Sequence, residues 1–564
     1  MTKLYKVHHN RMKIILFFIF SFVSIASFKT IYIQLFKSEN KIIGRQIDRK
    51  GDRGTIYDRY NNKLAYDIDF YDIYVDDLNY SDTLAVKYFL GEYFSEYNYS
   101  FKPLIKEKQT LLEGVPYHVV ENLNDVFNKF PEIKKSIKYK GRYYPQKGLA
   151  SQLIGRFSHK NDTIGGWGIE RTMNNNLKAK IGPLDYLVTS RGFNREDFSD
   201  NDFLKLSGED VVLTIDLKYQ TILEEELISQ LRKTNSKSAN GIIVDPFSGE
   251  ILAMASVPTS NLNEKLPSTE FIRDYVCQVS YEPGSTLKPF SILAGLSNNI
   301  IDLTKKYYCE NGKYKVPNLK RKPVVDHDPY DTLSVKQILA HSSNIGLVKI
   351  SSEIGREKIY NTFKEFGFGQ KTGIDSYYDD SGILKDLEDW DPHSLISIPI
   401  GQELRVTNLQ IAMAYSAIAN GGYLMEPKIV IENRNIDNYK LVREIKGSND
   451  NDIELLIESL KMVVSDGTAA PILGQSSVCS YGKTGTAQVY DSNIQKYSDS
   501  TYISSYAGIF PCDKPELVCV VSFIEPDEDK KWASQSAVPA FNEILNRISN
   551  EDRNLAIHIE DEIR

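Results

Sequence analysis

The sequence predicts an α+β protein in which an antiparallel sheet packs against helical layers, preceded by an elongated α+β spacer domain and one N-terminal transmembrane helix. Three observations lead to this prediction: an apolar run near the N-terminus, strand-like segments at both ends of the C-terminal half, and helical segments between them. With 564 residues, two or three folded units are expected. The expected division is a cytoplasmic tail (1–13), a transmembrane helix (14–36), a spacer (37–205), a large C-terminal domain (206–550) and a charged C-terminal tail (551–564).

The apolar run covers residues 14–36 and is interrupted only by polar residues such as Lys29. About 23 residues at ~1.5 Å each match a hydrocarbon core of ~30 Å, and Lys29 can snorkel to the interface. Basic residues precede the run, so the N-terminus is predicted to stay in the cytoplasm and the rest of the chain to be exported. A cleaved signal peptide is the alternative, but Phe28 is too bulky for a cleavage site, so a single-pass anchor in the cytoplasmic (inner) membrane is expected.

The spacer is rich in Tyr, Asn, Lys and Asp, and its alternating run at residues 71–75 predicts an edge or ribbon strand. The segments 53–59 and 165–171, taken alone, are typical of turns with ion pairs.

The large domain of residues 206–550 has its predicted strands at both ends. Strands are expected at residues 211–215, 239–245, 250–255, 482–489, 502–510 and 517–524, and helices at 217–233, 335–341, 409–419, 453–464 and 538–548.

Charge and cysteine content exclude several classes of protein. A net charge of -7 gives no reason to expect a nucleic-acid partner. Five widely spaced cysteines without a C-x-x-C pair indicate neither a zinc site nor a disulfide framework, so all five are expected to be buried thiols. No histidine spacing suggests a metal site, His327 is expected to be solvated or structural, and no metal or cofactor is predicted.

Ser285 and Lys288 place a hydroxyl and an amine on one face of a helix, if a helix begins here. A serine becomes a strong nucleophile when a neighbouring base accepts its proton, and a lysine can be that base only if its pKa falls toward neutrality. The S-x-x-K pattern alone is weak, since Ser38 and Lys41 match it just after the apolar run without any expected function.

Two further clusters support Ser285. Ser342 and Asn344 follow a predicted helix, and Lys483 opens a predicted strand near the sheet edge. Ser342 can relay a proton, Asn344 can hold an amide, and Lys483 can supply a second cation that keeps Lys288 neutral.

The residues after Lys483 suit the binding of a peptide substrate. Thr484 and Thr486 carry hydroxyl groups that suit a carboxylate. Gly485 allows close approach of a backbone, and strand-edge N–H groups can complete an oxyanion hole.

Together, S-x-x-K, S-x-N and K-T-G resemble the motif set of the penicillin-binding proteins. The segments 53–59, 142–145 and 166–170 resemble the signature segments of the class B, monofunctional members, as do 213–216, 281–284, 467–469 and 539–541 in the catalytic domain. Lys147 stands where the family usually has glycine, so the local turn in the spacer is expected to differ.

The resemblance implies a D-alanyl-D-alanine transpeptidase that cross-links peptidoglycan stem peptides of lipid-linked nascent glycan. Ser285 is implied as nucleophile, Lys288 as base, Ser342 and Lys483 as proton relay, and Asn344 as the group that holds the peptide. Thr484 and Thr486 are implied to bind the terminal carboxylate, and the Ser285 and Thr486 backbone amides to form the oxyanion hole. β-Lactams are implied as covalent inhibitors.

Residues 281–286, taken together with the S-x-N motif that begins at Ser342, are similar to those of septal, cell-division members. This resemblance implies divisome membrane proteins and a polytopic glycan polymerase as partners. An elongation-type transpeptidase, a membrane-anchored β-lactam sensor and a scaffold remain alternatives. A bifunctional enzyme would need a glycosyltransferase domain, and a β-lactamase a deacylating carboxylate; neither is recognisable in the sequence.

Overall fold

The structure is a computed structural model, and it describes residues 2–36, 43–75, 109–131, 133–157, 166–188, 194–195, 205–264, 268–375, 377–432, 439–445, 450–491 and 496–563. The chain divides into two compact units, of which the first comprises residues 1–54 and 178–208 and the second residues 55–177 and 209–564. Each unit is described by itself.

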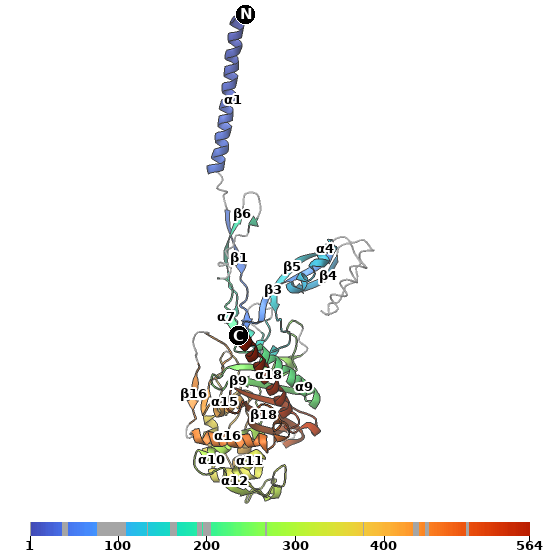
Figure 1. Ribbon diagram of the computed structural model, residues 1–564, viewed down its shortest axis with the longest axis vertical. Coiled ribbons are helices and arrows are strands. Elements are labelled where there is room, and N and C mark those ends of the chain that lie inside the picture. Colours follow the sequence, from blue (N-terminus) through green and yellow to red (C-terminus); the bar gives the residue numbers. More distant parts are fainter. Residues whose placement is uncertain are drawn as a thin grey trace. The chain divides into compact units, whose positions relative to one another are not determined.

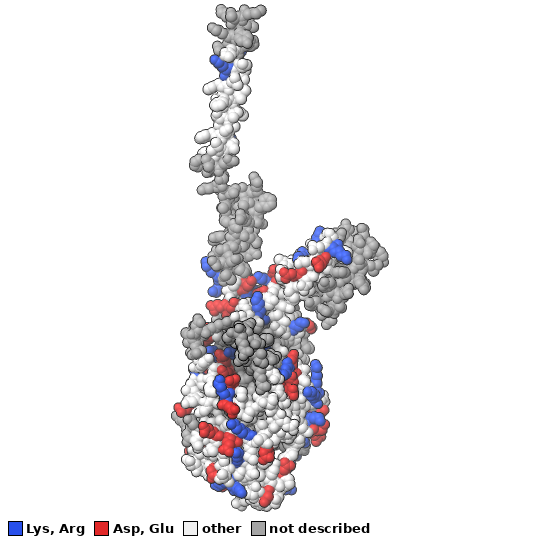
Figure 2. Space-filling model, viewed as in Figure 1, with Lys and Arg blue, Asp and Glu red and all other residues white. Residues whose placement is uncertain are grey.

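The first unit contains the long helix α1 (Thr2–Phe36) and a small antiparallel sheet. The segment Arg11–Tyr32 of α1 is long and apolar enough to cross a membrane, and its side chains are almost all exposed. On the face of this segment seen in Figure 2, charged side chains appear only near its N-terminal end. Strand β1 (Ile43–Lys50) pairs with β6 (Ile181–Val188), which also pairs with β7 (Asn194–Arg195). The predicted N-terminal apolar helix is therefore confirmed.

The spacer part of the second unit is built on one long strand, β3 (Lys63–Val75), which pairs antiparallel with β4 (Gln109–Pro116) and β5 (Ile133–Tyr143). Two short helices, α3 (Tyr117–Glu121) and α4 (Asn124–Lys129), complete a small hydrophobic core with these strands. Ribbon strands were expected here, and β3 extends the predicted strand at residues 71–75 toward the N-terminus.

A buried ion pair links two of the spacer segments that carry the family resemblance. The Arg142 side chain donates to the Glu170 carboxylate at 2.6 Å and pairs with Asp67 at 3.3 Å. Glu170 lies just after the start of α6 (Ile169–Thr172), and its side chain is inaccessible to solvent. Because an unpaired buried charge is costly, this pair fixes the 142–145 turn against the 166–170 turn.

The C-terminal part of the second unit contains a five-stranded antiparallel sheet in the order β10-β9-β19-β18-β17. Its strands are β9 (Ser238–Val244), β10 (Ile251–Val257), β17 (Tyr481–Asp491), β18 (Lys496–Phe510) and β19 (Leu517–Ile524). Sequentially distant strands meet at the centre, where β19 pairs with β9. Strand β17, which carries Lys483, lies at the sheet edge, as predicted.

Helices cover both faces of this sheet (Figure 1). Helices α9 (Leu217–Thr234) and α18 (Ala537–Ile563) share one hydrophobic core with one face. Helix α15 (Asn408–Ala419), buried along its whole length, packs on the other face. The layers thus confirm the predicted α+β fold.

A helical lobe next to α15 carries the serine motifs. It is formed by α10 (Lys288–Leu296), α11 (Val335–Ala340), α12 (Asn344–Ile354), α13 (Arg356–Glu365) and α16 (Asp450–Ser465). Short two-stranded sheets border it: β11 (Lys306–Tyr308) with β14 (Thr332–Ser334), β12 (Lys313–Tyr314) with β13 (Val324–Val325), and β15 (Tyr423–Met425) with β16 (Leu441–Glu444).

The C-terminal helix is longer than expected. The sequence analysis ended it at residue 548 and treated residues 551–564 as a tail, whereas α18 continues to Ile563. No glycine or proline follows residue 548, so the backbone meets no residue that strongly disfavours the helix.

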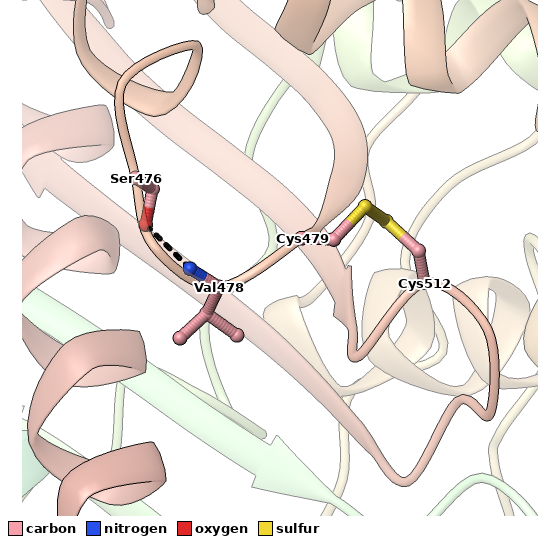
Figure 3. The surroundings of a disulfide bond; sticks show 4 residues. All are labelled: Ser476, Val478, Cys479 and Cys512. Atoms are coloured by element: carbon pink, nitrogen blue, oxygen red, sulfur yellow. Dashed lines mark hydrogen bonds between the residues drawn. A yellow bond between two sulfur atoms is a disulfide. The ribbon is translucent and has the colours of Figure 1, made fainter.

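The expectation of five free thiols is wrong for two cysteines. Cys479 and Cys512 form a disulfide with their Cα atoms 5.3 Å apart (Figure 3). They flank the open end of the β17–β18 hairpin, where Tyr481 pairs with Ile509. Their separation of 33 residues hides this proximity in the sequence, because only strand pairing brings the two ends together. Cys277, Cys309 and Cys519 are buried free thiols, as expected.

Candidate active site

Ser285 and Lys288 lie on one continuous helical segment. A 3₁₀ turn, η4 (Gly284–Leu287), holds Ser285 and leads directly into α10, whose first residue is Lys288. A spacing of three residues places the two side chains on the same side of the segment. Ser285 is partly exposed, whereas Lys288 is inaccessible to solvent. The Lys288 amine is therefore buried in the protein, whereas the Ser285 side chain is open to a substrate.

Two backbone contacts fix the turn that presents Ser285. Gly284 has a φ of +56°, and its N–H donates to the Gly401 carbonyl at 3.0 Å. A Cβ at Gly401 would lie 1.9 Å from the Gly284 carbonyl oxygen, so only glycine fits there. On the other side, the buried Tyr415 hydroxyl donates to the Thr286 carbonyl at 2.8 Å. The turn is thus held between α15 and the segment that ends at Gly401.

Lys288 reaches both predicted residues of the S-x-N motif. Its Nζ donates to the Ser342 carbonyl at 2.6 Å, to Asn344 Oδ1 at 2.8 Å and to Ser342 Oγ at 3.2 Å. Burial lowers the pKa of Lys288 to about 7, and the negative charge of Asp326 opposes this shift. A substantial neutral fraction near pH 7 makes this amine able to accept a proton.

Asp326 holds the S-x-N turn in place, and the sequence analysis missed it. One of its carboxylate oxygens accepts from the backbone N–H groups of Asn344 and Ile345 at 2.6 and 3.0 Å. The other accepts from the Ser343 hydroxyl at 2.6 Å. These bonds stabilise a turn in which Ser342 has a φ of +59°, a conformation that is uncommon for a residue with a Cβ. Only a tertiary contact reveals this role, because Asp326 lies in an acidic loop far from the motif in sequence.

Lys483 is the second fully buried amine. Its Nζ donates to the Thr484 carbonyl and to Thr484 Oγ1, both at 3.2 Å, and Thr484 Oγ1 also lies 2.6 Å from Thr468 Oγ1. Burial, together with the charge of Lys288, holds the pKa of Lys483 well below its usual range. The strand that carries Lys483 contacts the turn that leads into Lys288, which places the two amines in one site.

The electrostatics of the two amines bear on the role expected of Lys483, which was to supply a second cation that keeps Lys288 neutral. In the structure burial lowers the pKa of Lys288, and the charge of Lys288 contributes to the lowered pKa of Lys483. Two amines buried in one site disfavour each other's protonation, so each favours the neutral form of the other.

The K-T-G strand lies directly against the serine turn. A Cβ at Gly485 would come within 2.9 Å of the Pro283 carbonyl oxygen and of Thr286 Cγ2. A Cβ at Gly284 would be in ordinary contact with the Thr486 carbonyl oxygen, 3.4 Å away. Gly485 therefore permits the close approach that the sequence analysis predicted, although the partner is the protein's own serine turn.

The other side of the site is bordered by a loop that follows β19. The Ala533 N–H donates to Thr486 Oγ1 at 3.2 Å. The neighbouring Trp532 ring meets the His327 ring edge to face, with centroids 4.6 Å apart. Because His327 follows Asp326, this contact joins the loop that supports the S-x-N turn to the loop that supports the K-T-G strand. The predicted structural role of His327 matches this position.

A buried polar network underlies the serine turn and was also missed. The Tyr281 hydroxyl donates to Asn408 Oδ1 at 2.6 Å and lies 3.0 Å from Ser522 Oγ. Ser522 also donates to Asn408 Oδ1 at 3.0 Å. The network ties the segment before Ser285 to α15 and β19. No sequence signal identifies it, since its three members come from distant segments.

Within the residues that the structure describes, no cluster of three or more His, Cys, Asp or Glu side chains is suited to a metal ion. The hydrogen bonds of the site bring together two amines, hydroxyl groups and a side-chain amide.

A serine and a lysine on one helix, with a second lysine on the edge strand of an antiparallel sheet, define a class of active-site serine enzymes that act on peptide-like acyl groups. The comparisons agree with this class. Residues 241–546 match the penicillin-binding protein transpeptidase domain, and residues 48–213 match the penicillin-binding protein dimerisation domain. The chain belongs to the penicillin-binding protein family and, with this pair of domains, is a class B member similar to the septal type. It is thus an enzyme of the D,D-transpeptidase class.

Curated relatives match over much of the chain. Stage V sporulation protein D of Bacillus subtilis is 28% identical over 412 residues, which are 72% of this chain and 63% of that protein. The peptidoglycan D,D-transpeptidase FtsI of Buchnera aphidicola is 26% identical over 562 residues, which are 94% of this chain and 93% of that protein.

Solved structures share the fold. Penicillin-binding protein 3 of Mycobacterium tuberculosis, in complex with aztreonam, aligns with a TM-score of 0.66 and 20% identity over 90% of this chain and 97% of that chain. Penicillin-binding protein 2X of Streptococcus thermophilus aligns with a TM-score of 0.66 and 22% identity over 90% of this chain and 80% of that chain.

Proposed function

We propose that this protein cross-links peptidoglycan stem peptides through an acyl-enzyme on Ser285, in septal cell-wall synthesis. One observation carries the proposal: the buried Lys288 amine, whose pKa is lowered to about 7, lies on the same helical segment as a solvent-accessible serine. An amine of this kind can take the hydroxyl proton at neutral pH.

The first half-reaction forms the ester. Ser285 Oγ attacks the carbonyl of the penultimate D-alanine while its proton passes to Lys288 Nζ. The C–N bond to the terminal D-alanine then breaks, and the proton reaches the leaving amine through Ser342 and Lys483. Ser342 Oγ lies 3.2 Å from Lys288 Nζ, which supports this relay. The second half-reaction reverses the sequence: an acceptor amine attacks the ester, the C–O bond breaks and Ser285 regains its proton.

Substrate binding is assigned to the edge strand and the S-x-N turn. Asn344 holds the peptide amide, and Thr484 and Thr486 bind the terminal carboxylate on β17. Gly485 lets this strand pass close to the serine turn. Backbone N–H groups of Ser285 and Thr486 stabilise the negative charge on the tetrahedral oxygen. No cofactor takes part, and a β-lactam forms the same ester with Ser285.

The septal role rests on the likeness to FtsI proteins and to a sporulation protein. We assign the protein to the cytoplasmic membrane, with residues 1–13 inside and the two domains of residues 37–205 and 206–550 outside. Its partners are lipid-linked nascent glycan, a polytopic glycan polymerase and divisome membrane proteins.

The test is to incubate the protein with a labelled penicillin and map the modified peptide. The expected label lies on Ser285 and is absent in Ser285→Ala; a label elsewhere, or none on the folded protein, contradicts the proposal. In cells, Ser285→Ala is expected to block septation, while a fluorescent fusion of this variant still reaches the division site. Normal division of cells that carry Ser285→Ala would instead indicate a scaffold. Loss of cell shape without a division defect in these cells would indicate an elongation enzyme.

A further inference from the structure

A cavity lies in the same structural unit as the candidate active site, with none of the site's residues in its lining. Its volume is about 460 Å³, within the range of ligand pockets in proteins. The lining combines charged, amide and aromatic side chains. Six of them carry the argument: Gln152, Trp167, Arg171, Arg273, Gln278 and Tyr378.

Two guanidinium groups in this cavity have no carboxylate partner among the residues that the structure describes. Neither Arg171 nor Arg273 takes part in an ion pair within that part of the chain, and both side chains are exposed. The Arg171 guanidinium lies over the Tyr378 ring, 6.0 Å from its centroid, which leaves its N–H groups available. Unpaired guanidinium groups are suited to carboxylates, which they bind through two parallel hydrogen bonds.

Aromatic faces line the same cavity. Tyr378 is 51% exposed, and its ring serves as a platform for the Arg171 guanidinium. Trp167 is partly buried, and its indole N–H donates to the Ser151 carbonyl at 3.3 Å, which fixes the ring. Exposed aromatic faces offer flat apolar surfaces. A pyranose ring has an apolar face of matching shape, whereas its hydroxyl groups need amides such as the Gln278 side chain.

The walls of the cavity are held in place by tertiary hydrogen bonds. The Tyr377 hydroxyl donates to the Gln152 carbonyl at 3.2 Å, and the Gln152 side chain donates to the Pro258 carbonyl at 3.1 Å. On the wall that carries Arg273, the buried Asp274 accepts from the Val276 N–H at 2.8 Å. The cavity is thus a preformed site that joins the spacer to the catalytic part of the second unit.

We propose that this cavity binds an acidic saccharide, namely a pyranose unit together with a carboxylate of the peptide attached to it. This rests on the proposed function, since the polymer that the catalytic site would cross-link carries sugar rings and acidic peptides on the same strand. Arg171 and Arg273 bind the carboxylate, and Trp167 and Tyr378 contact the sugar. The site holds the glycan strand while the catalytic site acts on a stem peptide.

The test uses the full chain in detergent with Ser285 first acylated by benzylpenicillin, so that the catalytic site is filled. Calorimetric titration compares four probes: a disaccharide-pentapeptide, the pentapeptide alone, a neutral chitin tetrasaccharide and inorganic phosphate. The disaccharide-pentapeptide is expected to bind, and Arg171→Gln or Arg273→Gln to weaken it about tenfold, the size expected for loss of one charge-assisted hydrogen bond. Arg232→Gln, an exposed arginine on α9 outside the cavity, is the matched control.

Several outcomes would overturn the proposal. Unchanged binding in the double variant Arg171→Gln/Arg273→Gln would show that the probe binds elsewhere. Equal binding of the pentapeptide alone, of the neutral tetrasaccharide or of phosphate would indicate a peptide, neutral-sugar or simple anion site instead. Penicillin labelling of each variant reports correct folding. The same labelling tests the proposed function separately, because a chain that is not labelled at Ser285 fails there whatever the saccharide titration shows.

Discussion

Lys288 combines a buried amine with three hydrogen-bond acceptors, none of which is a carboxylate. Burial disfavours its charged form, and carbonyl and hydroxyl oxygens compensate that form less than a carboxylate would. The amine can therefore exchange a proton near neutral pH and return to its starting state after each cycle.

The rate of acylation is predicted to rise with pH through about 7. Only the neutral Lys288 amine can accept the Ser285 proton, and its pKa is about 7. Below that value the neutral fraction, and with it the rate, falls about tenfold per pH unit. Above it the rate levels off. The measurement is the second-order rate constant of labelling by a fluorescent penicillin between pH 5 and 9.

Lys288→Arg is the control for this profile. Its guanidinium stays charged over the whole range, so labelling is expected to be lost at every pH. A wild-type profile that is flat, or that declines as pH rises through 7, would contradict the assignment of Lys288 as base.

Asp326→Asn is predicted to lower both stability and acylation. The carboxylate accepts three hydrogen bonds from Ser343, Asn344 and Ile345, and an amide in its place weakens or breaks several of them. We expect the free energy of unfolding to fall by about 2 kcal/mol, and labelling to slow by about tenfold because the S-x-N turn loses its support. Urea unfolding and penicillin labelling measure the two effects.

Asp328→Asn is the matched control for this substitution. Asp328 is exposed and pairs with His327 at 3.0 Å, and such surface pairs contribute at most about 1 kcal/mol. Equal effects of the two substitutions would show that the loop as a whole, rather than the Asp326 bonds, supports the site.

At the scale of elements, the β17–β18 hairpin includes the strand that carries Lys483, and a disulfide bond joins the two ends of the hairpin. The two strands pair from Tyr481 to Asp491, and the disulfide closes the end that is nearer to Lys483. Lys483 itself is held by strand pairing with Ala507, independently of the sulfur atoms.

The double variant Cys479→Ala/Cys512→Ala is predicted to lose stability but to keep its acylation rate. A closed loop of this length restricts the unfolded chain, so its loss lowers the free energy of unfolding by about 3 to 4 kcal/mol. The rate of penicillin labelling should change less than about twofold, because backbone pairing still positions β17. Urea unfolding with and without reductant provides the check.

Reductant should lower the stability of the wild type to that of this variant and leave the variant unchanged. A variant as stable as the wild type without reductant would show that the disulfide does not form. Slow labelling of a folded variant would show that the bond is needed to place Lys483.

At the scale of the whole molecule, α1 is the one helix of the described residues that is long and apolar enough to span a membrane. Four basic residues precede or begin its apolar stretch: Lys3, Lys6, Arg11 and Lys13. Positive charge of this kind retains a segment in the cytoplasm.

Alkaline phosphatase fused after residue 564 is predicted to be active, because that enzyme folds only outside the cytoplasm. Green fluorescent protein fused to the N-terminus should fluoresce, because it folds in the cytoplasm, where the N-terminus is proposed to lie. Replacing the four basic residues by glutamate is expected to reduce phosphatase activity severalfold. Full activity of that variant would show that the basic residues do not set the orientation.

The sequence alone allowed most of the fold to be predicted. Period-two and helical patterns located the five strands of the central sheet and helices α9, α11, α15, α16 and α18, since one buried face leaves a regular trace in the order of residues. They gave no bounds for α12 and α13. The three motifs proposed to be catalytic were also recognisable, because the chemistry proposed for them requires particular side chains at fixed spacing. The family followed from their joint occurrence in order.

Other features were decided only by the tertiary structure. The Cys479–Cys512 bond, the support from Asp326 and the network around Tyr281 join residues distant along the chain, and no local pattern records such contacts. The lowered pKa values of Lys288 and Lys483 are also decided by the tertiary structure, because burial causes the shifts and burial exists only once the chain has folded. The sequence thus determined which groups are available for catalysis, whereas folding determined their charge and their neighbours.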